Sequence, residues 1–309
     1  MSIINSGSFA KALWPGVNAW YGKAYSEYPE EYSKLFDKST SSKAFEEDVG
    51  ISSFGLAVQK SEGAPISYDS ERQAFITRYQ HAVYALGFII TREMMEDDQY
   101  DVIGKRKAEG LAFSMRQTKE IVAANVYNRA FSTNQLGGDG SSLIAAGYPG
   151  GSTNHPNFAG GSQTNGPSVA SDLSEAALEQ AAIDIAGFTN DRGLKIAVRP
   201  RKLIIPKELM WEADRILKTE GRVGTDLNDL NAIKAKGLIP EVVVNHYLVD
   251  TDAWFILTDV RDGLKYFSRR EDQFAMDEDF DTENAKYKAT ARYTFGWTDP
   301  RGIYGSPGA

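Results

Sequence analysis

The sequence predicts an α+β protein, and three observations support this fold class. Residues 91–131 contain no proline and follow a helical pattern throughout. Residues 75–90 carry the alternation and the β-branched and aromatic side chains of strands. Residues 195–263 combine short apolar strands with short helices. Strands and helices that fall in separate blocks are typical of the α+β class.

Residues 91–131 predict a long helix. Leu111, Met115, Val122 and Val126 are four, seven and four residues apart and share one face. An unbroken helix of this length spans about 60 Å at about 1.5 Å per residue, whereas a globule of this chain length is roughly 50 Å across. We therefore expect an elongated molecule or contacts with neighbouring subunits. Residues 96–98 could divide the segment into two helices. We expect the opposite face to meet solvent or a polar interface; it carries Lys105, Arg106, Glu109, Arg116, Lys119 and Glu120.

The first ninety residues do not read as an independent domain. Residues 1–50 mix aromatic side chains with turn formers, and residues 30–38 alone suggest a short helix. Disordered segments are poor in aromatic residues, and interfaces are rich in them. We therefore expect residues 1–50 to form an arm that docks on another subunit through Trp14, Trp20 and Tyr21.

Residues 51–90 predict a long β-hairpin arm. A short strand at residues 55–60 precedes a turn, and strands follow at residues 75–80 and 83–90. An isolated hairpin is only marginally stable in water, so a second copy of the same protein is the expected support. Charged residues at the tip and along the edge complete the candidate inter-subunit interface: Lys60, Glu62, Arg72 and Arg78.

The remaining segments predict smaller elements. Residues 132–171 are rich in glycine, serine and asparagine and suggest a surface insertion. Ser171 is placed to begin an amphipathic helix that ends near residue 187. Short strands are expected at residues 195–198, 202–205, 241–249 and 254–258, and closing strands at residues 264–267 and 287–297.

Composition limits the function classes. The chain has 309 residues, a net charge of −8 and no cysteine, which excludes disulfides and cysteine-ligated metals. The negative charge argues against wrapping nucleic acid over the whole surface, and the apolar run at residues 82–90 is too short to span a membrane. His81, His155 and His246 are isolated from one another, and no nucleophile or phosphate-binding motif is present. We expect no enzyme activity, no catalytic residue, no metal and no cofactor.

The order of arm, β-arm, long helix, α/β unit and closing strand resembles the major capsid protein of tailed bacteriophages, which has the Hong Kong 97-type fold. Three strings are similar to those of such capsid proteins: IITREMMEDDQY at residues 89–100, NVYNRAF at residues 125–131 and TDPRGIYGS at residues 298–306. The resemblance covers residues 14–306 and depends mainly on the order of the segments.

The resemblance implies a division of the chain. Residues 1–50 would be the N-terminal arm and residues 51–90 the extended β-hairpin loop. Residues 91–194 would form the peripheral domain, with the spine helix and the glycine-rich insertion. Residues 195–263 would form the axial α/β domain, and residues 264–309 would return to the peripheral domain as closing strands.

The resemblance also implies a structural function. The protein would assemble with itself into the pentamers and hexamers of an icosahedral head that encloses double-stranded DNA without sequence-specific binding. Expected partners are a separate scaffolding protein and a portal, with a decoration protein as a further candidate, and no membrane. The expected location is the virion, after assembly in the cytoplasm of the host bacterium. Two alternatives remain open: an encapsulin-like compartment shell and, ranked last, a cytoplasmic enzyme.

Overall fold

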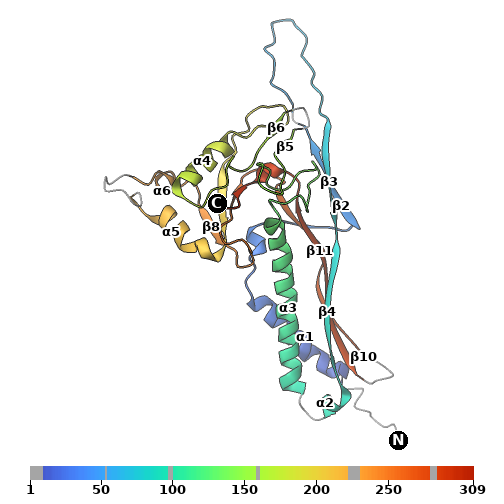
Figure 1. Cartoon of the computed structure of the whole chain (residues 1–309). Coiled ribbons are helices and arrows are strands. Elements are labelled where there is room, and N and C mark those ends of the chain that lie inside the picture. The colour runs from blue at the N-terminus through green and yellow to red at the C-terminus, as the bar shows by residue number, and fades with distance from the viewer. Residues whose placement is uncertain (1–9, 53, 97–99, 158–160, 222–229, 279–283) are drawn as a thin grey trace.

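The structure is a computed structural model of residues 1–309, and it describes all of them except 1–9, 53, 97–99, 158–160, 222–229 and 279–283. A long sheet runs beside a long helix, a second sheet with three helices lies to one side, and a loop projects beyond both (Figure 1). The mixture of separate sheets and helices confirms the α+β class.

The first half of the chain supplies the arm, the loop and the long helix. Its elements are α1 (Ala10–Glu27), a 3₁₀ turn (Tyr32–Lys34), β1 (Asp37–Thr40), β2 (Phe45–Ile51), β3 (Gln73–Gln80), β4 (Ala82–Ile90), α2 (Arg92–Glu96) and α3 (Tyr100–Asn128).

The second half supplies the second sheet and the central strands of the first. Its elements are β5 (His155–Pro156), β6 (Ser162–Gln163), α4 (Glu175–Ala186), β7 (Pro200–Ile205), a 3₁₀ turn (Lys207–Leu209), α5 (Met210–Lys218), α6 (Ala232–Lys236), β8 (Glu241–Val244), β9 (Trp254–Thr258), β10 (Leu264–Glu278), β11 (Ala285–Trp297), a 3₁₀ turn (Pro300–Gly302) and β12 (Ile303–Ser306).

The long sheet has the strand order β1-β10-β11-β4. Buried and more exposed side chains alternate along most of β11, so one face of the strand packs on the core. Tyr287 stacks on Phe88 of β4 with ring centroids 4.9 Å apart, and Tyr293 stacks on Tyr84 at 4.6 Å. These rings belong to the same core cluster as the apolar residues of α3. The alternating pattern of the sequence therefore becomes one face of a sheet packed on a helix.

The predicted long helix is confirmed as α3, which has 29 residues and is about 44 Å long at about 1.5 Å per residue. Leu111, Met115 and Val126 are buried, and Val122 packs against them. α2 precedes α3, and residues 97–99 between them lie outside the described residues.

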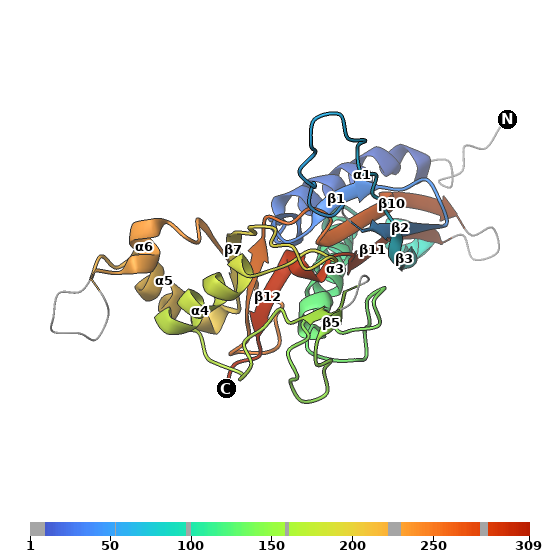
Figure 2. The same ribbon diagram turned by 90° about the horizontal axis from the view of Figure 1, so that it is seen from above.

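The second sheet has the order β12-β9-β7-β8. Its apolar residues form a cluster with those of α4, α5 and α6, which lie at the end of the molecule away from α1 (Figure 2). β12 pairs with β9, with Ile303 opposite Leu257. Residues 303–306 therefore belong to the second sheet, although the sequence analysis grouped them with the closing strands of the first. The chain turns at Asp299, whose carboxylate accepts from the Arg301 backbone N–H at 2.9 Å.

The segment of residues 132–171 was expected at the surface, but part of it is buried. Leu143 and Ile144 are fully buried, and the Ile144 N–H donates to the carbonyl of Ala130 at 2.8 Å. Serines precede them and two alanines and a glycine follow, so this short apolar stretch gave no periodicity from which burial could be predicted. The segment ties the end of α3 to the core.

Three other expectations were wrong in detail. α4 begins after Ser174, whose hydroxyl accepts from the Ala177 N–H, and not after Ser171. The expected strand at residues 55–60 is irregular extended chain, because β3 pairs with β2 instead. Of residues 195–198, Lys195 alone forms a bridge, with Thr189.

Candidate assembly surface

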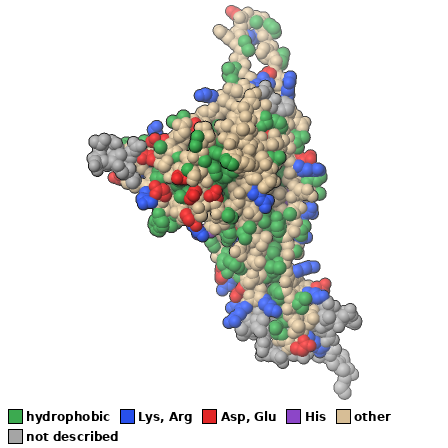
Figure 3. Space-filling view, viewed as in Figure 1, with side chains coloured by type: hydrophobic (Ala, Val, Ile, Leu, Met, Phe, Trp, Pro, Cys, Tyr) green, Lys and Arg blue, Asp and Glu red, His purple; other side chains and the backbone are tan. Residues whose placement is uncertain are grey.

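Residues 52–72 form a loop that projects from the hairpin of β2 and β3 (Figure 1). Large apolar side chains of this loop are mostly exposed: Phe54 56%, Leu56 77%, Val58 73%, Ile66 64% and Tyr68 92%. Hydrophobic side chains are visible along the projection in Figure 3. A cluster of exposed large apolar residues on one segment indicates a protein interaction site.

The tip of the loop carries two of the predicted interface residues. Lys60 and Glu62 are exposed, and Gly63 beside them has a φ of 76°, a backbone conformation that favours glycine. Arg72 and Arg78 lie at the root instead. The Arg72 N–H donates to Ser52 Oγ at 2.9 Å, and Arg78 pairs with Glu47 at 3.3 Å in the same chain.

The returning half of the loop is fixed to the body by Arg192. Its guanidinium donates to Asp69 Oδ2 at 2.7 Å and to the carbonyl of Ser70 at 2.8 Å. Asp69 Oδ2 also accepts from the Gly55 N–H at 2.8 Å. The pKa of the Asp69 carboxyl is lowered, mainly by backbone hydrogen bonds, of which the one from Gly55 has the largest effect. The charge of Arg192 lowers it further. The loop therefore leaves the body in a defined direction.

The N-terminal arm packs on its own chain, whereas it was expected to dock on another subunit. Residues 10–27 form α1, which packs on α3 of the same chain. Tyr21 is 5% exposed and stacks on Phe274 of β10 at 4.6 Å, so its ring is used inside its own subunit. Trp20 is partly buried against the same core. The side chain of Trp14 lies outside the described part of α1. A helical arm was missed because its proline and glycine were read as turn signals.

The charged face of α3, which was expected to meet solvent or a polar interface, is partly buried against the arm of its own chain. Arg116, Lys119 and Glu120 are 6%, 1% and 2% exposed. Arg116 donates to Glu30 Oε1 at 2.7 Å, and Glu120 accepts from the N–H groups of Glu31 and Tyr32 at 3.0 Å. These three charged side chains are internal because α1 and the 3₁₀ turn that follows it cover this face of α3. Only the pairing of the arm with α3 could have revealed this.

Lys119 is the most enclosed of these charges. Its ammonium donates to Asp272 Oδ2 at 2.8 Å and to the Tyr25 hydroxyl at 3.0 Å. The rings of Tyr25, Tyr32 and Tyr293 lie within 5.3 to 5.8 Å of the ammonium. Hydrogen bonding and aromatic faces together compensate the desolvated charge. The cluster joins the arm, α3 and β10.

Glu120 gives a testable pH dependence. Burial, opposed by the two backbone hydrogen bonds, raises its pKa to about 7 from 4.5. Because the folded state binds this proton more tightly than the unfolded state, the resulting stabilisation is present below about pH 4.5 and is lost as the pH rises towards 7. Relative to Glu120→Gln, the free energy of unfolding of the wild type should fall by about 2–3 kcal/mol over this interval. Urea titrations at several pH values measure it; parallel curves for the two proteins would contradict the assignment.

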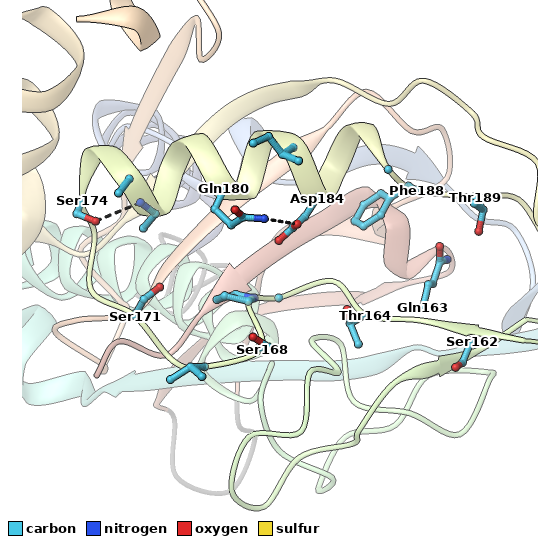
Figure 4. A pocket seen from close by; sticks show the side chains of 17 residues that line it. Ser162, Gln163, Thr164, Ser168, Ser171, Ser174, Gln180, Asp184, Phe188 and Thr189 are labelled. Carbon is cyan, nitrogen blue, oxygen red and sulfur yellow. Dashed lines mark hydrogen bonds between the residues drawn. The ribbon is translucent and has the colours of Figure 1, made fainter. Parts of the chain in front are cut away.

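A groove of about 910 Å³ runs between α4 and residues 162–171 (Figure 4). Asp184, at its wall, accepts from Gln180 at 2.8 Å and from the Tyr304 hydroxyl at 2.7 Å. Val169 and Ile183 are 76% and 66% exposed. The groove is a second surface with exposed apolar groups, and its one ionisable lining residue, Asp184, already has partners.

The three histidines lie apart. His81 is buried with Nε2 3.0 Å from Ser41 Oγ, and burial lowers its pKa. His155 is buried with Nδ1 2.7 Å from Asp139 Oδ2. His246 Nδ1 lies 2.7 Å from Glu31 Oε1 at the surface. Within the described ranges, no group of three or more His, Cys, Asp or Glu side chains could hold a metal ion. In the same residues, no helix is long and apolar enough to cross a membrane.

A family model described as phage capsid protein matches residues 75–306 of the chain. The matched region begins inside β3 and runs to the end of β12, so it includes α3, the whole second sheet and all of the long sheet except β1. The chain belongs to the phage capsid protein family. No curated protein matches it.

Solved structures show the fold of this phage capsid protein. A structure titled Mycobacterium phage Patience has a TM-score of 0.53 at 10% identity and covers 98% of this chain and 88% of its own. The procapsid of bacteriophage JBD30 has a TM-score of 0.52 at 13% identity, covering 97% and 75%. A virus-like particle from Pyrococcus furiosus has a TM-score of 0.52 at 10% identity, covering 94% and 97%. The predicted Hong Kong 97-type fold is confirmed.

The family match also favours one of the alternatives. The likeness to the Pyrococcus particle is one of fold, whereas the family model that matches is described as phage capsid protein. The chain is therefore a structural major capsid protein, and the compartment-shell alternative has less support. The exposed loop and the groove are the candidate surfaces through which such a subunit meets its neighbours.

Proposed function

We propose that this phage capsid protein assembles with itself into the pentamers and hexamers of an icosahedral head around double-stranded DNA. The loop at residues 52–72 is the main support, because five of its large apolar side chains are more than half exposed in the single chain. Fully burying such a side chain stabilises an assembly by about 1.5–3 kcal/mol. In a closed shell every subunit would make this contact.

The two sheets support the proposed division of the chain. Residues 51–90 would supply the extended loop, although β4 itself belongs to the long sheet. Residues 91–194, with β10 and β11, would form the peripheral domain. Residues 195–263 would form the axial domain at the symmetry centres, and β12 joins that sheet. Residues 1–50 would be an arm folded along α3.

The proposed partners follow from the same function. A separate scaffolding protein would guide assembly in the cytoplasm of the host bacterium, and a portal would occupy one vertex. A decoration protein is a further candidate. The packaged DNA would be enclosed without sequence-specific binding, in keeping with the net charge of −8. Of the predicted interface residues, Lys60 and Glu62 at the tip remain the best placed, and Trp20 is only partly covered by its own chain.

Expression of the chain alone and with its neighbouring phage genes tests the proposal. We expect closed shells in negative-stain electron micrographs, with a single protein band at the 34.0 kDa subunit mass on a denaturing gel. Nuclease-resistant DNA should accompany particles from infected cells. Subunits that remain monomeric under all these conditions would contradict the proposal.

A further inference from the structure

The projecting loop is held to the body at its root (Figure 1). The Ser52 N–H donates to the carbonyl of Arg72 at 2.9 Å, and three residues further out the Gly55 N–H donates to Asp69 Oδ2 at 2.8 Å. In the described part of the chain, no residue from 56 to 68 forms a hydrogen bond or an ion pair with the body. The direction of the exposed part is therefore set by the contacts of the root.

Arg192 supplies the contact between this root and the body. Its Nη1 donates to Asp69 Oδ2 at 2.7 Å, and its Nη2 donates to the carbonyl of the next residue, Ser70, at 2.8 Å. Such a forked contact fixes the orientation of the partner as well as its distance. A β-carbon at Gly55 would lie 3.2 Å from Arg192 Nη1 and 3.3 Å from Asp69 Oδ2. Both halves of the loop therefore lie against one side chain of the body.

The turn that carries Arg192 is closed by its own hydrogen bonds. Residues 189–195, which we call the Arg192 turn, have their two ends in an antiparallel bridge. The Asn190 side chain is 7% exposed, and its oxygen accepts from the Arg192 N–H at 3.0 Å and from the Leu194 N–H at 2.9 Å. The Asn190 N–H donates to the Leu194 carbonyl at 2.8 Å. The backbone of Arg192 is therefore held in place independently of the loop.

The Arg192 turn is also bound to the segment that joins the two sheets. Arg301 donates to the carbonyl of Thr189 at 3.3 Å, and its Nη2 lies 2.6 Å from Asp299 Oδ2. Asp299 and Arg301 lie between β11 and β12, where the chain passes from the long sheet to the second sheet. Arg192 thus fixes the direction of the loop relative to this central part of the body.

A small rotation at the root has a large effect at the tip. Seven residues separate Gly55 from Glu62, and extended chain of that length reaches up to about 23 Å at about 3.3 Å per residue. A rotation of about 20° at the root would therefore move the tip by about 8 Å, which is twice the distance of about 4 Å at which apolar side chains make contact. A loop with a free root would be misplaced for any one partner surface most of the time.

We propose that Arg192 is a positioning residue for assembly. Its forked contact with Asp69 and Ser70 holds the loop in its projecting direction in the free subunit, so that less order has to be gained when a neighbour is met. This role rests on the proposed self-assembly and adds a residue outside the loop on which the rate of assembly depends. The side chains of Arg192 and Asp69 are 27% and 42% exposed, and exposed ion pairs contribute little to folding stability. The effect therefore falls on the loop and not on unfolding of the subunit.

Spin labels measure the direction of the loop in the free subunit, because the chain has no cysteine of its own. Glu62→Cys places one label at the tip, and Ile183→Cys places the other on α4, where this residue is 66% exposed. We expect a narrow distribution of label-to-label distances that broadens in Arg192→Met. Asp69→Ala should broaden it equally, and this second variant leaves the Arg192 turn intact because Asp69 belongs to the loop.

The matched control is Arg215→Met, which removes an exposed arginine that pairs with Glu212 inside α5. It should leave the distance distribution unchanged. Light scattering of unlabelled protein then measures assembly, which should be about tenfold slower in Arg192→Met if about one in ten directions of the freed loop fits a neighbour. The urea midpoint should stay that of the wild type. Arg192→Lys can pair with Asp69 but cannot form the fork, so it should recover part of the rate.

Three results would overturn this role of Arg192 while wild-type particles leave the proposed function intact. Unchanged distances in both Arg192→Met and Asp69→Ala would show that other contacts position the loop. Broadened distances with a normal assembly rate would show that assembly does not need the positioning. A lowered urea midpoint in both variants would assign the contact to general stability. A wild type that forms no particles would instead contradict the proposed function, and with it this role, even if the label distances changed as expected.

Discussion

Replacing Leu56, Val58 and Tyr68 with serine is expected to abolish shell assembly while leaving the subunit folded. These side chains are 77%, 73% and 92% exposed, so the free energy of unfolding of the subunit should change by no more than about 0.5 kcal/mol per substitution. In the shell each would lose the roughly 1.5–3 kcal/mol that burial of a large apolar side chain supplies. That loss recurs at every subunit contact.

The measurement combines urea unfolding of the free subunit with sedimentation and negative-stain microscopy of the assembly reaction. The matched control is Val169→Ser/Ile183→Ser, because these residues are 76% and 66% exposed on another surface. We expect the control to retain particles. Normal particle yield from the loop variant would contradict the role of the loop, and equal loss in both variants would show that apolar surface in general, not the loop, supports assembly.

Replacing Lys119 with methionine should destabilise the subunit by about 3–5 kcal/mol. The substitution leaves Asp272, whose side chain is 7% exposed, without its cation. The other carboxylate oxygen of Asp272 is already buried without a hydrogen-bond partner in the described part of the chain. Methionine largely keeps the packing of the lysine side chain. The loss of stability therefore comes from the buried carboxylate, which is left without a compensating charge.

Two variants make this prediction specific. Lys119→Met/Asp272→Asn removes both charges and should recover most of the lost stability. Lys105→Met, on the same helix, removes an exposed lysine 4.0 Å from Glu109 and should cost less than about 1 kcal/mol. Urea denaturation of all three measures the effect. If Lys119→Met lowered the free energy of unfolding no more than Lys105→Met, the buried pair of Lys119 and Asp272 would not hold the arm to α3.

The long helix and the two closing strands could be predicted because their periods are local. Leu111, Met115 and Val126 repeat over many turns of α3, and residues 285–297 alternate along β11. The stretch at residues 254–258 was predicted with its observed bounds, because all five residues are buried on both faces of the sheet. Such patterns depend only on the local spacing of apolar side chains, so they can be recognised without knowing which segments pack together.

The candidate site could be predicted only in part. The sequence pointed to a charged loop tip at Lys60 and Glu62 and to an exposed arm. It did not show that Phe54, Leu56 and Tyr68 are the large uncovered groups, since exposure depends on what else lies nearby. It also assigned Tyr21 to a neighbour, whereas the ring packs on Phe274 of the same chain. In the sequence, an aromatic residue looks the same whether its ring packs on its own chain or on a neighbouring subunit.

The sequence by itself determined the α+β class, the long helix, the strand pattern and the likeness to tailed-phage capsid proteins. These rest on period, composition and segment order, which are properties of the chain alone. Only the tertiary structure decided that Arg116, Lys119 and Glu120 are internal, that β12 joins β9, and that residues 132–171 enter the core. Each of these depends on a contact between segments far apart in the sequence, and burial of a charge or pairing of a strand is fixed by the partner it meets.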